Sequence, residues 1–188
     1  MNTTRRHVLR AGGGLLLAGL APALVTARAA AEVRIEMKGN ESGSLVWFEP
    51  IGVQVSPGTT VRWLNLDPIN SHTATAYHPD NDGKPRRIPD KARPWHSDYL
   101  LPNEEFSVTL DVPGVYDYFC VPHELAGMVG RIVVGNVQDA DWQYSDIAND
   151  GIPEVALMAF PSVTDILASG TVHFDPASGA GHGGHDTK

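Results

Sequence analysis

Cysteine is almost absent from this sequence, which has one, Cys120, in 188 residues. A single cysteine excludes an intramolecular disulfide framework, and it excludes zinc or iron–sulfur sites built from cysteines alone. Positive charge is also scarce, because 14 Lys and Arg face 22 Asp and Glu, which gives a net charge of −8. A protein that binds the phosphate backbone of nucleic acids needs a basic face, so we expect no nucleic-acid partner.

Long hydrophobic runs are scarce as well. The apolar run at residues 11–25 is shorter than the roughly 20 residues that a membrane-spanning helix needs. Arg5 and Arg6 precede this run, and mostly small residues follow it at 27–31. A positive start, an apolar centre and a small-residue end are typical of an export signal, and the paired arginines resemble a twin-arginine signal. We therefore expect residues 1–31 to be a twin-arginine-like signal peptide, with a general secretion signal and an uncleaved membrane anchor as the alternatives.

Export to the periplasm or another extracytoplasmic space has consequences for the mature chain. Without residues 1–31, 10 Lys and Arg face 22 Asp and Glu, for a charge of −12. An unpaired thiol such as that of Cys120 is vulnerable to oxidation in such a compartment unless something occupies it. A bound metal ion is the obvious occupant.

The segment from residue 33 to about residue 135 has the pattern of short strands separated by turns. Apolar and polar residues alternate in Val33–Met37 and in Phe106–Leu110, and Pro-Gly turns stand at 57–58 and 113–114. The other expected strands cover residues 45–48, 51–55, 59–65, 71–77, 115–120 and 131–134. No helical pattern of useful length interrupts the series, which indicates an all-β antiparallel sandwich or barrel.

A long polar loop separates two of these strands, at residues 76–102. A loop of this length is uncommon in a compact domain and is often functional. We expect its alternating acidic and basic side chains to be solvated, with docking of a partner as the alternative. His78 and His96 are expected to lie on the surface, with a second metal site or a contact surface for a redox partner as the alternatives.

A C-terminal extension covers residues 138–176. Its part from Pro153 to Ala168 has apolar residues near helical spacing, interrupted by Pro161, so we expect it to be partly helical. We predict that the extension packs on the sandwich or mediates association. The last residues, 177–188, are rich in Gly and His and are expected to be disordered.

One short segment carries the chemistry. Cys120, His123 and Met128 stand at the spacing C-x2-H-x4-M between two expected strands. A thiolate, an imidazole and a thioether suit copper that cycles between Cu(I) and Cu(II), and a trigonal site of this kind needs one more histidine. His72, in Asn-Ser-His-Thr after the 59–65 strand, supplies it. A buried structural thiol and zinc are the alternatives, although structural zinc prefers four strong ligands and rarely includes Met.

These motifs resemble the cupredoxins, the blue copper proteins of the plastocyanin, azurin and pseudoazurin type. The resemblance covers residues 33–135 and rests on the C-V-P-H-E-L-A-G-M loop, the G-V-Y-D-Y-F-C strand before it, the S-P-G-T-T-V-R-W-L-N strand and turn, and G-R-I-V-V-G. It implies a Greek-key β-sandwich over residues 32–137, followed by the C-terminal extension.

The resemblance also implies a site: one type 1 copper ion per chain. The matching ligand positions are His72, Cys120, His123 and Met128. Plastocyanins usually place Asn directly after the upstream histidine, where it braces the loop and bonds the Cys sulfur. This chain has Thr73 there, which could do the same through its hydroxyl.

The same resemblance suggests how electrons would reach the site. His123 would expose its ring edge through an apolar patch, for which Leu125, Ala126 and Pro122 are candidates. The aromatic residues expected in the dry core behind the site are Trp63, Tyr118 and Phe119.

Two functional hypotheses follow. The first is an exported, monomeric electron carrier, not an enzyme, that shuttles single electrons between periplasmic or membrane-bound redox proteins. Its closed coordination sphere would leave no position for a substrate. The second is a copper-binding or delivery protein in which the loop histidines and the tail residues His182 and His185 pass the metal on.

Overall fold

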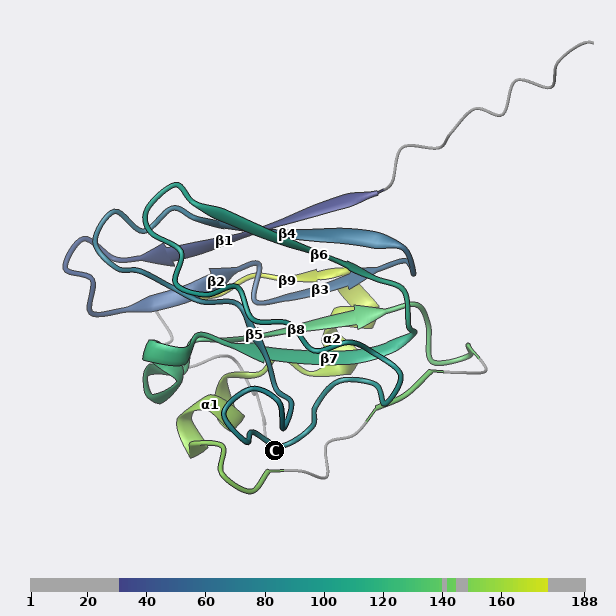
Figure 1. Cartoon of the computed structure of the whole chain (residues 1–188). Helices are drawn as coiled ribbons and strands as arrows, with labels where there is room; N and C mark the ends of the chain where they lie inside the picture. The colour runs from purple at the N-terminus through teal and green to yellow at the C-terminus, as the bar shows by residue number, and fades with distance from the viewer. Residues whose placement is uncertain (1–30, 140–141, 145–148, 176–188) are drawn as a thin grey trace, which may run out of the picture.

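A computed structural model describes residues 31–139, 142–144 and 149–175 of the chain (Figure 1). Residues 1–30 of the expected signal peptide and the expected disordered tail at 177–188 lie outside the described residues. Among the described residues, no helix has the length and the apolar character that crossing a membrane requires.

The described residues form two β-sheets that lie over one another as layers (Figure 1). The sheet orders are β2-β1-β4-β6 and β5-β7-β8-β3-β9. The strands are β1 (Glu32–Gly39), β2 (Val46–Glu49), β3 (Gly52–Val55), β4 (Thr59–Asn65), β5 (Thr75–Ala76), β6 (Glu105–Leu110), β7 (Gly114–Phe119), β8 (Val129–Val134) and β9 (Thr171–Val172). The expected all-β sandwich is confirmed.

The strand pairing is mixed. β1 runs parallel to β4 and β3 runs parallel to β8, whereas the other paired strands are antiparallel. A parallel pair cannot be closed by a tight hairpin, so the chain crosses between the sheets from β2 to β3 and from β3 to β4. The pattern of short strands and turns predicted antiparallel pairing. It contains no information about crossings between the sheets, so the two parallel pairs could not be predicted from it.

Aromatic side chains fill the space between the sheets. Val61 and Trp63 on β4 are fully buried and alternate with partly exposed Arg62 and Leu64, as a strand with one face on a core requires. The Trp63 ring packs edge-on against Tyr118 on β7, with ring centroids 5.3 Å apart. The expected burial of Trp63, Tyr118 and Phe119 is confirmed.

The segment at 71–77, expected to be a strand, is regular only in β5. Before it, His72 forms an isolated bridge with Leu100, through backbone hydrogen bonds of 3.1 and 2.8 Å. This part of the chain pairs with the long loop instead of a full strand. The partner for a longer strand is missing because residues 77–104 form no regular element.

The long loop is packed into the fold to a greater extent than its composition indicates. Its apolar side chains Ile88, Trp95 and Leu100 belong to the main core. The expectation that its charges are solvated is wrong for Arg87, which is buried, and for Lys84, which forms an ion pair. Each of these cations pairs with a buried carboxylate, Arg87 with Asp117 and Lys84 with Glu124.

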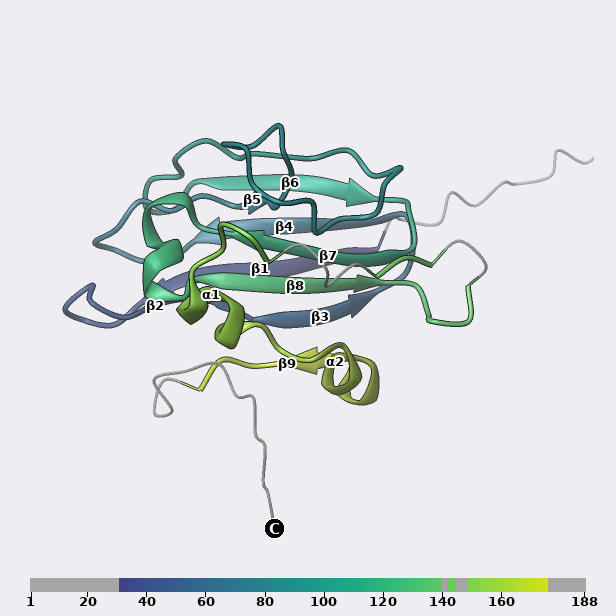
Figure 2. The ribbon, with the colours of Figure 1, turned by 90° about the horizontal axis from the view of Figure 1, so that it is seen from below.

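The C-terminal extension packs on the sandwich (Figure 2). It contains α1 (Glu154–Ala159), α2 (Val163–Ser169) and β9, with Pro161 between the helices as expected. β9 pairs antiparallel with β3, and the fully buried Ile166 of α2 packs with Val115 and Val133. The extension is therefore an integral layer of the described fold.

Candidate metal centre

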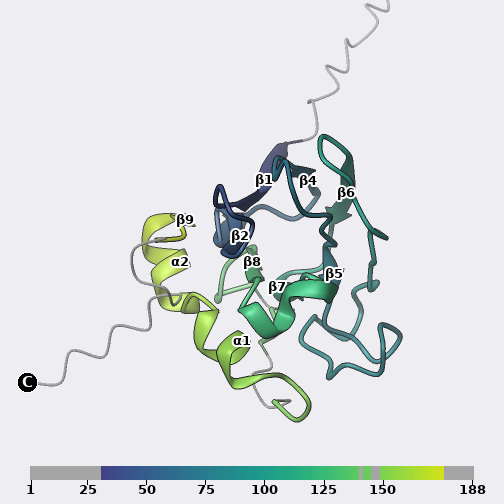
Figure 3. The same cartoon turned by 90° about the vertical axis from the view of Figure 1, so that its left-hand side faces the viewer.

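The expected ligands meet at one end of the sandwich. Cys120 directly follows β7, His123 lies in the short 3-10 helix η1 (Val121–Ala126), and Met128 directly precedes β8. His72 lies in the connection after β4. Figure 3 looks at this end and shows η1 beside α1, in agreement with the contacts between these two elements.

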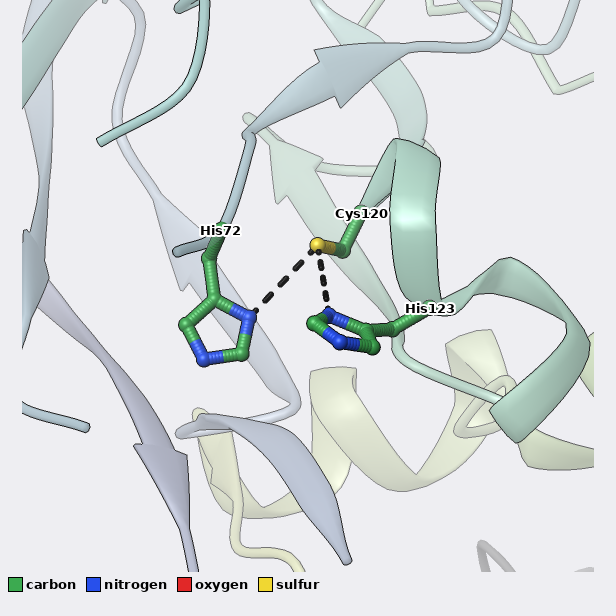
Figure 4. Close-up of side chains that lie close together, drawn as sticks. All are labelled: His72, Cys120 and His123. Atoms are coloured by element: carbon green, nitrogen blue, oxygen red, sulfur yellow. Dashed lines mark hydrogen bonds between the residues drawn. The ribbon is translucent and has the colours of Figure 1, made fainter. Parts of the chain in front are cut away.

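Three donor atoms converge on one point (Figure 4). The Nδ1 atom of His72 lies 3.6 Å from the Cys120 sulfur, and the Nδ1 atom of His123 lies 3.4 Å from it. The donor atoms of all three residues lie within 4.8 Å of one another. Both imidazoles thus direct the same ring nitrogen at one sulfur, a donor set of two nitrogens and one thiol that suits copper.

Met128 is the last residue of the ligand loop, which begins at Cys120. The Cys120 amide donates to the Met128 carbonyl over 3.0 Å, and the Met128 amide donates to the His123 carbonyl over 3.1 Å. The Met128 side chain is fully buried. The loop therefore folds back on itself and holds Met128 near the other expected ligands.

Gly127 makes this turn possible. Its φ of 77° lies in the left-handed region, where side chains are strained. Its amide caps η1 by donating to the Glu124 carbonyl. A Cβ at this position would lie 3.4 Å from Cγ2 of Val155 and 3.6 Å from Cβ of Ala159, so α1 packs directly on the ligand loop.

The thiol of Cys120 is held in a dry and specific environment. The Thr73 amide donates to its sulfur over 3.3 Å. Burial raises the pKa of the Cys120 thiol to about 12, so without a metal the group carries its proton at neutral pH. Burial also lowers the pKa of His72 and of His123, so both imidazoles are neutral at neutral pH and each has one ring nitrogen with a lone pair for a metal.

Sequence reasoning missed a buried carboxylate behind His72. Asp67 and His72 are both fully buried, and the Asp67 Oδ2 atom lies 3.1 Å from the His72 Nε2 atom. Burial alone would raise the pKa of Asp67, but hydrogen bonds from Asn70 and from the Ile69 amide lower it. The signal in the sequence was an Asp five residues before a candidate ligand, at the start of a turn.

A second missed group ties the long loop to the ligand loop. Glu124, next to His123, accepts a hydrogen bond from the Tyr77 hydroxyl at 2.8 Å and forms an ion pair with Lys84 at 2.5 Å. The Lys84 nitrogen also lies over the Phe119 ring. The long loop thereby braces η1 from the side, a role that its composition did not indicate.

The outer side of the ligand loop is apolar and exposed. His123 is partly exposed, and Leu125 beside it is 81% exposed. Pro122 and Ala126 are exposed as expected. Met158 of α1, on the element that contacts η1, adds a further exposed apolar side chain.

The other histidines do not join the site. His78 is buried, so its expected surface position is wrong, and its Nδ1 atom accepts from the Asp80 amide at 3.1 Å. His96 shares a 2.8 Å hydrogen bond with Thr75. Among the described residues, His72, Cys120 and His123 form the only group of this kind that could hold a metal ion. His182 and His185 lie outside the described residues.

Comparisons with known proteins identify the relatives of this chain. Residues 33–135 match the family model of copper binding proteins, plastocyanin/azurin family. A chloroplastic plastocyanin of Tetradesmus obliquus is 38% identical over 122 residues, which cover 64% of this chain and 77% of the relative. A pseudoazurin of Paracoccus pantotrophus is 33% identical over 133 residues, or 71% of this chain and 80% of the relative. A solved pseudoazurin from Sinorhizobium is 34% identical, with a TM-score of 0.45, over 56% of this chain and 75% of that one.

Fold, site and comparisons define a class of protein, the cupredoxins with a type 1 copper site. The chain belongs to the plastocyanin/azurin family of copper-binding proteins, a family of electron carriers, and copper is its cofactor.

Proposed function

We propose that this chain holds one copper ion through His72, Cys120, His123 and Met128 and carries single electrons between redox protein partners. The observation that carries the proposal is the convergence of two Nδ1 atoms and one sulfur within 4.8 Å at a buried position. A copper ion bound there would supply one-electron chemistry by cycling between Cu(I) and Cu(II).

The residues around the donors support electron transfer because they keep the donors in place. His72 and Cys120 are fully buried, and each is fixed by a hydrogen bond from or to a neighbour, Thr73 at the sulfur and Asp67 at the imidazole. A site with four protein donors and no open position gives a substrate no access to the metal. Donors that move little between redox states keep the reorganisation small, as an electron carrier requires.

The exposed side of His123 is the proposed port for electrons. The residue is partly exposed beside the apolar residues Pro122, Leu125 and Ala126, and an apolar surface can dock a partner transiently without a strong ion pair. We propose that the redox partners contact this surface, that the chain works as a monomer, and that residues 1–31 direct it out of the cytoplasm.

The alternative role in copper delivery has less support among the described residues. Delivery would be favoured by donors that hand the metal from one site to the next. His78 is buried and accepts from the Asp80 amide, and His96 is bonded to Thr75, so neither extends the site. The described geometry favours a centre that retains its metal.

Voltammetry combined with a chelator challenge tests the proposed function. The copper-loaded protein should give a reversible one-electron wave that persists over many cycles in the presence of a copper chelator. The Cys120→Ser variant, which replaces the thiol by a hydroxyl of similar size, should lose the wave. Rapid loss of copper from the unaltered protein to the chelator would support delivery instead and contradict electron carriage.

A further inference from the structure

The two ring nitrogens of His72 face different partners, the buried carboxylate of Asp67 and the sulfur of Cys120. The Nε2 atom lies 3.1 Å from the Asp67 carboxylate, and the Nδ1 atom lies 3.6 Å from the Cys120 sulfur. An ionised carboxylate only accepts hydrogen bonds, so it selects the tautomer with the proton on Nε2. The lone pair of Nδ1 is then directed at the site where the metal would lie.

The Asp67 carboxylate is itself held firmly. Its Oδ1 atom accepts hydrogen bonds from the Ile69 amide at 2.8 Å and the Asn70 amide at 3.1 Å. Its Oδ2 atom accepts a third from the Asn70 side chain at 2.8 Å, besides the contact with His72. These bonds do not involve the metal, so the carboxylate is in position before a metal binds.

The end of β1 provides space for this carboxylate. A Cβ on Gly39 would lie 2.1 Å from the Asp67 Oδ2 atom, so any larger residue there would displace the side chain. The glycine lets the backbone of β1 approach a buried charge closely, which excludes water from it. An excluded, fixed charge acts more strongly on its neighbours than a solvated one.

The donors that bind Asp67 are two backbone amides, one side-chain amide and the imidazole of His72, with no lysine or arginine among them. Its negative charge therefore faces the imidazole ring without a cation among these partners. A carboxylate behind a ligand histidine raises the basicity of the ligand and favours the higher charge on a bound metal.

We propose that Asp67 is a positioning residue that fixes the His72 tautomer and lowers the reduction potential of the copper centre by favouring Cu(II) over Cu(I). The proposal rests on the proposed copper site and names a regulator of its potential. It gives Asp67 a role that a purely structural turn residue would not have.

The Asp67→Asn variant tests the proposal with nearly unchanged shape. Its side-chain amide has one oxygen and one NH2 group in place of the two carboxylate oxygens, so the donors of Ile69, Asn70 and His72 compete for a single acceptor atom. Loss of such a partner typically costs about 10–100-fold in metal affinity. If Cu(II) affinity falls tenfold more than Cu(I) affinity, the potential rises by about 59 mV for this one-electron couple. We expect a rise of that order.

Two control variants separate charge from disruption. Asn70→Ala removes one hydrogen bond to the carboxylate but keeps its charge, so its potential should shift far less. Ile166→Ala disturbs the fold in α2, in the cluster with Val115 and Val133, and should leave the potential unchanged. An equal shift in either control would overturn the proposal.

A measurement on the metal-free protein keeps the two proposals distinguishable. Nitrogen-15 NMR of the unaltered protein should show His72 with its proton on Nε2, and Asp67→Asn should shift or mix the tautomers. A proton on Nδ1 in the unaltered protein, or an unchanged potential in a folded Asp67→Asn variant, overturns the role of Asp67. Failure of the proposed function would instead appear as a missing redox wave in the unaltered protein.

Discussion

The backbone amide of Thr73 donates a hydrogen bond to the Cys120 sulfur over 3.3 Å. The Thr73 hydroxyl also accepts from the Val121 amide at 2.9 Å and bonds the Thr75 hydroxyl at 2.9 Å. The residue that replaces the usual Asn thus contacts the sulfur through its backbone and braces the ligand loop through its side chain.

Thr73→Val should therefore destabilise the protein. The variant keeps the backbone amide that donates to the Cys120 sulfur. The variant leaves the part-buried Val121 amide without its acceptor, and an unsatisfied donor away from solvent costs about 1–3 kcal/mol. Urea unfolding of the metal-free protein measures the loss. Thr109→Val, which removes an exposed hydroxyl pair with Thr60, should cost within about 0.5 kcal/mol and serves as the control. Equal losses in both variants would contradict the bracing role.

The Cys120 thiol should react slowly in the folded, metal-free protein. Its pKa of about 12 keeps it protonated at pH 8, and the thiolate is the reactive form. A thiol-reactive disulfide should modify it much faster in urea than in buffer. Fast modification of the folded protein would show that the site is open or that the thiol is ionised.

The same raised pKa predicts how metal binding depends on pH. Because the thiol keeps its proton between about pH 7 and 9 while both histidines stay neutral, binding should release one proton. Metal affinity should then rise about tenfold for each pH unit over that range. Titrations at several pH values measure the slope, and a flat profile would mean that the metal does not displace the Cys120 proton.

A buried cluster of three charges attaches the extension to the sandwich. Asp117 forms ion pairs with Arg87 at 2.6 Å and Arg131 at 2.7 Å, and all three side chains are at most 6% exposed. Arg131 donates to the Pro161 carbonyl at 2.8 Å, and Arg87 donates to the Asn149 side chain at 2.8 Å. The cluster thus links the long loop, β7, β8 and the C-terminal extension.

Asp117→Asn should cost about 3–5 kcal/mol of unfolding free energy, because it leaves two buried guanidinium groups without their carboxylate. Glu36→Gln at the exposed pairs with Arg34 and Lys38 should cost about 1 kcal/mol or less. Urea unfolding compares the two variants. A loss at Asp117 no larger than that at Glu36 would show that the buried cluster is not essential.

The extension should unfold together with the sandwich. Ile166→Ala removes a fully buried side chain from the interface of α2 with β7 and β8, which typically costs about 2–5 kcal/mol. Leu167→Ala, at a partly buried neighbour, should cost less. Fluorescence and circular dichroism should give one common transition, and a separate early transition for α2 would contradict cooperative packing.

The ligand loop could be predicted from the sequence because its chemistry is local. Cys120, His123 and Met128 lie within one short stretch whose spacing is distinctive, and His72 follows a well-patterned strand. Asp67 was missed because an acidic residue in a turn is ordinarily solvated, whereas here Asn70, His72 and the end of β1 at Gly39 pack around the carboxylate.

The ion pairs of the long loop could not be predicted from the sequence either. Arg87 lies 30 residues from Asp117 along the chain, and Lys84 lies 40 residues from Glu124. Alternating charges in a Pro-rich segment indicate solvation, and nothing local shows which of them will pair with a buried carboxylate. The helices of the extension were predictable in position from their apolar spacing and from Pro161, whereas the edge pairing of β9 with β3 depends on tertiary contacts.

A visible absorption titration of the metal-free protein with Cu(II) tests the central claim most directly. The account predicts an intense blue thiolate-to-copper band that saturates at one copper per chain, is bleached by ascorbate, returns on oxidation and is absent from Cys120→Ser. A colourless or weakly coloured product, or equal spectra for the protein and the variant, would mean that the Cys120 sulfur does not bind copper.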